Sequence, residues 1–92
     1  MPMNDHWEAI LSEARDITSP AQIPALRDRI TPSMAASLWP LICAMDFVET
    51  GDPDLLEKLE PVTRGLADTV LDRWSERFEI RGWRRAQSRI PV

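Results

Sequence analysis

The segment from Thr31 to Gly51, TPSMAASLWPLICAMDFVETG, restricts the possible folds more than any other part of the chain. Residues 31–45 contain no charged side chain, although charged residues make up 28% of the sequence. A helix without charges is stable only where it is covered on most sides. Thr31 and Pro32 are a typical N-cap and first-turn pair, and Gly51 suits the left-handed residue that ends a helix. The segment is predicted to be a buried central helix.

Pro40 lies in the middle of this predicted helix. It removes one backbone N–H, and its ring pushes against the carbonyl of Ala36, which predicts a kink of ~20° or more. The alternative is a division into two helices at Trp39. Cys43, on the same segment, is predicted to be a small buried hydrophobic residue, since no histidine in its own segment can activate it.

The other predicted helices flank this segment. An amphipathic helix is expected from Asp5 to near Thr18, a short helix over Pro24 to Ile30, another short helix after Asp52-Pro53, and a long helix over Val62 to Glu79 that ends at Gly82. In the long helix an apolar row repeats at every fourth position: Val62, Leu66, Val70, Trp74 and Phe78. No stretch alternates apolar and polar residues in the manner of a strand. The sequence therefore predicts an all-α fold.

The length of 92 residues allows one domain, so residues 1–92 are expected to form a small single-domain bundle of about four to five helices around the Pro-kinked central helix. One cysteine excludes an internal disulfide, and one cysteine with one histidine cannot provide a four-ligand zinc site. The uncharged run is shorter than the ~20 residues of a membrane span. We expect a protein of the cytoplasm, without membrane contact, metal or cofactor.

Motifs of catalysis and nucleotide binding are missing. No serine stands in a G-x-S-x-G setting, and the three glycines form no phosphate loop. The acids before Gly51 do not have EF-hand spacing, and a helix-turn-helix over Pro24 to Leu41 would present no Arg, Lys, Asn or Gln to bases. The chain is not expected to be an enzyme.

Charge is segregated along the chain. Residues 1–80 carry seven basic and fifteen acidic side chains, whereas the C-terminal tail, residues 81–92, carries four arginines and no acid. Such an uneven distribution of charge is typical of proteins that bind a charged partner. The candidate interaction residues are therefore Trp83, Arg81, Arg84, Arg85 and Arg89 in the tail, and Asp46, Glu49, Asp52, Asp54 and Glu57 in the acidic segment 46–60.

Two classes of function fit these features. The first is a small non-catalytic protein–protein interaction module, an adaptor, regulator or inhibitor of a larger protein, which uses a helical face, the acidic segment 46–60 and the Trp/Arg tail. The alternative is a nucleic-acid-associated accessory protein that binds phosphate through the tail, or an acidic mimic of nucleic acid of the immunity or anti-defence type. A homodimer is also considered. For Trp83 the sequence leaves open an interface anchor or a fold-back onto the domain, and for Trp39 a core position or a dimer contact.

Overall fold

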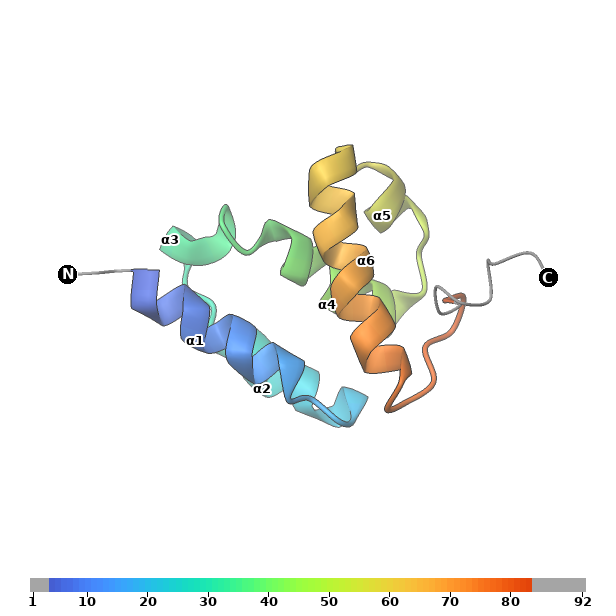
Figure 1. Cartoon of the computed structure of the whole chain (residues 1–92), viewed down its shortest axis with the longest axis horizontal. Helices are drawn as coiled ribbons and strands as arrows, with labels where there is room; N and C mark the ends of the chain where they lie inside the picture. The colour runs from blue at the N-terminus through green and yellow to red at the C-terminus, as the bar shows by residue number, and fades with distance from the viewer. Residues whose placement is uncertain (1–3, 84–92) are drawn as a thin grey trace.

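The computed structural model describes residues 4–83, with side chains for residues 8–83. In this range the chain forms six α-helices and one 3-10 turn, and no strand (Figure 1). The helices are α1 (Asn4–Arg15), α2 (Ile23–Asp28), α3 (Pro32–Ala35), α4 (Trp39–Thr50), α5 (Asp54–Glu57) and α6 (Pro61–Ser75), with the 3-10 turn η1 (Pro20–Gln22) before α2. The predicted all-α fold is confirmed.

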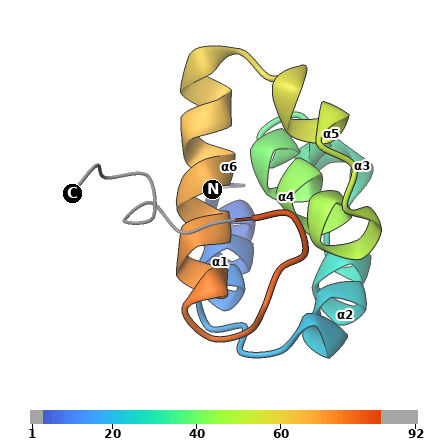
Figure 2. The same ribbon diagram turned by 90° about the vertical axis from the view of Figure 1, so that its right-hand side faces the viewer.

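Helix α4 is the centre of the packing. It packs most extensively against α6, and also against α5 and α2, while α1 packs against α6 and α2. Figure 1 shows α1 and α2 together on one side of the molecule, and Figures 1 and 2 both show α5 near the N-terminal end of α6. Five residues of α4 are buried, more than in any other described helix: Leu41, Cys43, Ala44, Met45 and Phe47. The buried position predicted for Cys43 is confirmed.

Segment 31–51 is two helices, so the single Pro-kinked helix is wrong and the division at Trp39 is right. Only the second part of the segment is buried as predicted, because none of residues 31–37 is buried. The chain leaves the helical path at residues 36–38, and Leu38 is the N-cap of α4. Pro40 therefore stands in the first turn of α4, where its missing N–H has no partner to lose. Breaking the helix also removes the clash with the Ala36 carbonyl. Gly51 ends α4 in the left-handed conformation, φ 75°, as predicted.

The predicted apolar row of α6 is only partly buried. Trp74 is fully buried and Val70 is half-buried, but Val62 and Leu66 are 80% and 57% exposed. The reason is helix geometry. Each step of four residues turns the side chain by about 40° around the axis, so the three steps from Val62 to Trp74 turn it by about 120°. It therefore begins on the solvent side and ends in the core.

Helix α6 ends at Ser75, earlier than the predicted Glu79. The chain then turns back, and Figure 2 shows this segment crossing from the end of α6 towards α4. Ile80 is buried, and Gly82 adopts φ 80° in the turn that brings Trp83 onto α4. Gly82 thus serves a turn beyond the helix and not the helix end. Burial of Ile80 and Trp83 favours the turn over further helix.

Candidate functional site

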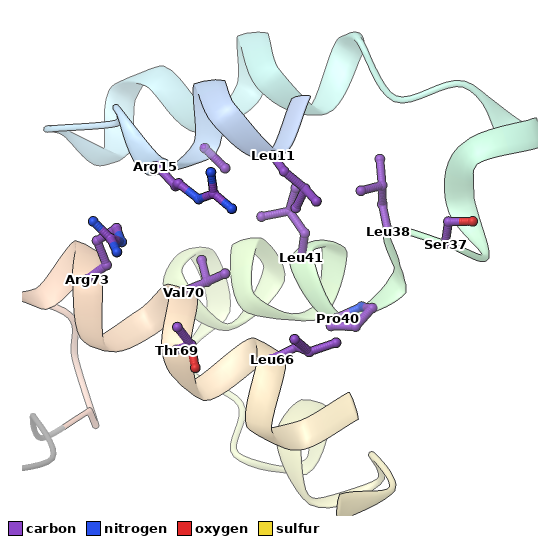
Figure 3. A pocket seen from close by; sticks show the side chains of 11 residues that line it. Leu11, Arg15, Ser37, Leu38, Pro40, Leu41, Leu66, Thr69, Val70 and Arg73 are labelled. Atoms are coloured by element: carbon purple, nitrogen blue, oxygen red, sulfur yellow. The ribbon is translucent and has the colours of Figure 1, made fainter. Parts of the chain in front are cut away.

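An apolar groove lies between α1, α4 and α6, with a volume of about 610 Å³ (Figure 3). Most of its lining is aliphatic. The residues that line it are Leu11, Ala14 and Arg15 of α1, Ser37 and Leu38 before α4, Pro40 and Leu41 of α4, and Leu66, Thr69, Val70 and Arg73 of α6. This volume and composition are typical of sites that take an apolar ligand or an apolar side-chain cluster.

The α6 wall of the groove is open to solvent. Leu66 is 57% exposed, and Val62, one turn earlier on the same helix, is 80% exposed. Trp39, which precedes Pro40 at the start of α4, is 51% exposed. These three are the large exposed apolar residues in the part of the chain that the structure describes. Of these, Leu66 lines the groove itself, and an apolar groove with an exposed leucine on its wall is a typical docking surface for another protein.

Two arginines, Arg15 and Arg73, lie at the same end of the groove (Figure 3). Both residues are exposed, and within the described residues neither guanidinium forms an ion pair or a hydrogen bond. Other arginines of the domain have partners: Arg29 pairs with Glu13, and Arg64 pairs with Asp68 at 3.0 Å. The groove therefore offers an apolar floor with uncompensated positive charge at one end.

The ends of α1 and α6 are fixed against each other beside this charge. The Trp74 indole N–H donates to the Ala14 carbonyl at 2.6 Å. Arg77 donates to the Arg15 and Ile17 carbonyls, the latter at 3.0 Å. These bonds satisfy carbonyls at the C-terminal end of α1, where a cation is also favoured by the helix dipole. Arg15 directly follows Ala14, and Arg73 directly precedes Trp74. These hydrogen bonds therefore hold this end of the groove in place.

The predicted acidic segment does not form one free surface. Arg27 of α2 pairs with Asp46, at 2.6 Å between Nη1 and Oδ1, and with Glu49. Burial acts to lower the pKa of Arg27, but hydrogen bonding to Asp46 and the charges of both carboxylates raise the pKa overall. Asp46 and Glu49 therefore connect α4 to α2.

The other predicted acids lie between α4 and α5. The Asp52 carboxylate accepts the Asp54 backbone N–H at 3.0 Å, a contact typical of a turn before a helix. Asp54 and Glu57 are exposed, and within the described residues their carboxylates form no ion pair. Of the five predicted acids, these two remain most available to a partner.

Trp83 folds back onto the domain, which was one of its two predicted positions. Its ring meets Phe47 edge-on, with centroids 6.1 Å apart and planes at 75°. Its indole N–H donates to Asp72 Oδ1 at 3.0 Å. Arg81 is exposed, and its side chain passes over Gly51. Arg84, Arg85 and Arg89 lie outside the described residues.

The described residues give no support for a metal site or a reactive cysteine. They contain no group of three His, Cys, Asp or Glu side chains that could hold a metal ion. Cys43 is buried, and desolvation, together with the negative charge of Asp46, raises the pKa of its thiol, which disfavours the reactive thiolate. No helix in this range is long and apolar enough to span a bilayer.

Comparison with protein-family models, with curated proteins and with solved structures found no match for this chain. The site is therefore argued from its own geometry. Of the groove residues, the sequence singled out Leu66 and Val70 only as members of an apolar row, and Pro40 only as a kink or a division between helices. Arg15 was missed because nothing local distinguishes it. Its position matters only through contact between helices that are distant in sequence.

Proposed function

We propose that this protein is a small non-catalytic protein–protein interaction module that regulates or adapts a larger protein. The observation that carries the proposal is the apolar groove between α1, α4 and α6, with Leu66 exposed on its wall and Arg15 and Arg73 unpaired at one end. The groove takes an amphipathic helix of the partner, whose apolar residues cover Leu66 and whose carboxylates meet the arginines.

Three features support a binding role. The groove is concave and mainly aliphatic, as helix-binding grooves are. Its two arginines can form charge-assisted hydrogen bonds to carboxylates without breaking an existing ion pair. Asp54 and Glu57, which are also without ion pairs among the described residues, add a separate acidic contact for a basic region of the same partner.

Site-specific photo-crosslinking in the source cells tests this function. A photoreactive amino acid replaces Leu66 in the groove wall or, as a matched control, Ala25, which is exposed on α2. We expect an adduct much larger than twice the 10.5 kDa chain at position 66 and not at position 25. The double variant Arg15→Glu, Arg73→Glu should remove this adduct.

The same adduct at positions 25 and 66, or no adduct to a larger protein at position 66, would contradict the proposal. Far-UV circular dichroism of each variant confirms that the helices are retained. Purification of the adduct and peptide mass spectrometry then identify the partner segment, which should be helical and acidic at one end.

A further inference from the structure

The two arginines of the groove lie in line with its aliphatic walls. On α6, Leu66, Val70 and Arg73 have the spacing i, i+4 and i+7, which places them on one face of the helix. On α1, Leu11 and Arg15 have the spacing i and i+4 and also share a face. Figure 3 shows both guanidinium groups at the same end of the groove. Each of these two walls therefore presents an aliphatic stretch that ends in an arginine.

The most deeply buried residues of the groove lining are apolar. Ala14, Leu38 and Leu41 are 2%, 1% and 2% exposed. The hydroxyl of Thr69 donates its proton to the Gly65 carbonyl of its own helix at 2.9 Å, so it offers no donor to a ligand. An apolar group that enters the groove therefore leaves water and separates no polar groups from their partners.

The charge of the groove lining has one sign. Arg15 and Arg73 form no ion pair or hydrogen bond with the described residues, and no Asp or Glu of this range lines the groove. An anion can therefore bind both guanidinium groups without breaking an existing pair. A cation would be repelled by them, and a neutral apolar molecule would use only the aliphatic part. The lining favours a ligand with one anionic end and an apolar body.

We propose that the groove binds a free aliphatic carboxylate of medium chain length. Its carboxylate lies between Arg15 and Arg73, where the planar guanidinium groups can each donate two hydrogen bonds to it. Its alkyl chain runs from there along Leu41 towards Leu38 and Leu66. This inference goes beyond the function proposed above, because binding of a small ligand requires no partner protein.

The dimensions of the groove set the length of the ligand. Leu66 and Arg73 are seven residues apart, which corresponds to about 10 Å along the axis of α6. An extended chain advances by about 1.2 Å per bond, as the extended polypeptide backbone does, so about eight to ten carbons cover this distance. The groove volume of about 610 Å³ is within the range of small-molecule sites in proteins. A carboxylate of this length therefore fills the aliphatic part of the groove.

Isothermal titration calorimetry of the full 92-residue chain tests this inference. The ligands are the sodium salts of straight-chain carboxylates of about six to twelve carbons, each below its micelle concentration. Affinity should rise by about three- to fourfold per added methylene up to about ten carbons and level off beyond. Decanoate should bind with a Kd below about 1 mM. Decyltrimethylammonium has an alkyl chain of the same length and the opposite charge, so it should bind at least about tenfold more weakly.

Substitutions separate recognition of the charge from burial of the chain. Arg15→Gln and Arg73→Gln should each weaken decanoate binding by about five- to tenfold without weakening that of decyltrimethylammonium. Arg81→Gln, at an exposed arginine outside the groove, is the matched control and should leave both unchanged. Leu66→Gln should weaken the binding of both ligands, and circular dichroism verifies that each variant is folded. In NMR spectra of wild type, decanoate should shift the methyl signals of the groove residues Leu11, Leu38, Leu41, Leu66 and Val70.

Absence of saturable decanoate binding up to about 5 mM would overturn the inference. So would decanoate binding that Arg15→Gln and Arg73→Gln affect no more than Arg81→Gln does, or equal affinities for decanoate and decyltrimethylammonium. The function proposed above fails by a different result, the absence of a larger adduct at position 66. A protein that binds decanoate in the groove but forms no larger adduct would leave this inference standing alone.

Discussion

At the scale of single residues, Trp74 joins two distant parts of the chain. Its side chain is fully buried, and its indole N–H donates to the Ala14 carbonyl at 2.6 Å. Trp74→Phe should destabilise the fold by about 2–4 kcal/mol, because it leaves a cavity and removes a buried hydrogen bond. Urea denaturation followed by circular dichroism measures this change. Trp39→Phe is the matched control; since Trp39 is 51% exposed, its replacement should cost less than about 0.5 kcal/mol.

Cys43 makes stability depend on pH above neutrality. Burial and the charge of Asp46 raise the pKa of its thiol in the folded state, so the folded chain holds this proton more tightly than the unfolded chain. The contribution is fully present below the unfolded thiol pKa, about 8.5, and is lost as the pH rises above that value. The free energy of unfolding of wild type should therefore fall by up to about 1.4 kcal/mol per pH unit in this window.

Cys43→Ala removes the titration, so its unfolding free energy should fall less between pH 8 and 10. Urea denaturation at pH 7, 8, 9 and 10 gives the two curves. Parallel curves with a constant offset would contradict this role of the thiol.

At the scale of elements, Pro40 tests the division of segment 31–51. Because Pro40 stands in the first turn of α4, Pro40→Ala should change the unfolding free energy by less than about 1 kcal/mol. In one kinked helix the same substitution would restore a hydrogen bond and stabilise by up to ~3 kcal/mol. Val48→Pro, inside α4, is the control and should cost ~3 kcal/mol or more.

Gly65 and Gly51 should respond oppositely to alanine. Gly65→Ala should stabilise the monomer by about 0.5–1 kcal/mol, because the added methyl group has free space in a helix interior. Gly51→Ala should destabilise by about 1 kcal/mol, because φ at this residue is 75°. Thermal unfolding followed by circular dichroism measures both; a loss of stability in Gly65→Ala would contradict the first expectation.

The sequence predicted where the helices lie better than it predicted where they end and which of their residues are buried. Capping pairs and charge-free runs are local signals, so helices starting near Asp5, Pro24, Thr31, Pro53 and Val62 could be read directly. In the sequence alone, Pro40 is compatible with a kink inside one helix or with the start of a second helix. Tertiary packing determines which of the two forms. The row Val62 to Phe78 is a continuous apolar pattern in the sequence, but residues at i+4 spacing wind around α6, so the pattern did not predict which of them are buried. The groove combines helices far apart in sequence, so no local pattern could predict it.

At the scale of the whole molecule, the contacts of the arginines determine which charged side chains remain accessible to a partner. Arg27 forms ion pairs with Asp46 and Glu49, and Arg77 donates hydrogen bonds to carbonyls of α1 and the turn after it. The negative segment that a linear reading treats as one docking patch is thereby partly used within the fold. Positive charge remains available at Arg15 and Arg73 instead, on the face that the linear charge pattern had not indicated.

Contacts between the C-terminal segment and the helices determine where the folded domain ends. The sequence placed a basic tail from residue 81, but Ile80 and Trp83 pack on the helices, with Trp83 against Phe47 and bonded to Asp72. A chain that ends at Trp83 should therefore melt at a higher temperature than a chain that ends at Ile80. Removing residues 81–92 also takes away Trp83, which should cost about 1–3 kcal/mol and lower the melting temperature by at least ~4 °C.

Thermal unfolding followed by far-UV circular dichroism compares the two truncated chains with the full chain and with Trp83→Phe. The phenylalanine variant keeps an aromatic ring for Phe47 but loses the indole N–H for Asp72, so its melting temperature should lie between those of the two truncated chains. Equal melting temperatures for chains ending at residues 80 and 83 would show that Trp83 contributes nothing to the core. In that case the domain would end before residue 81.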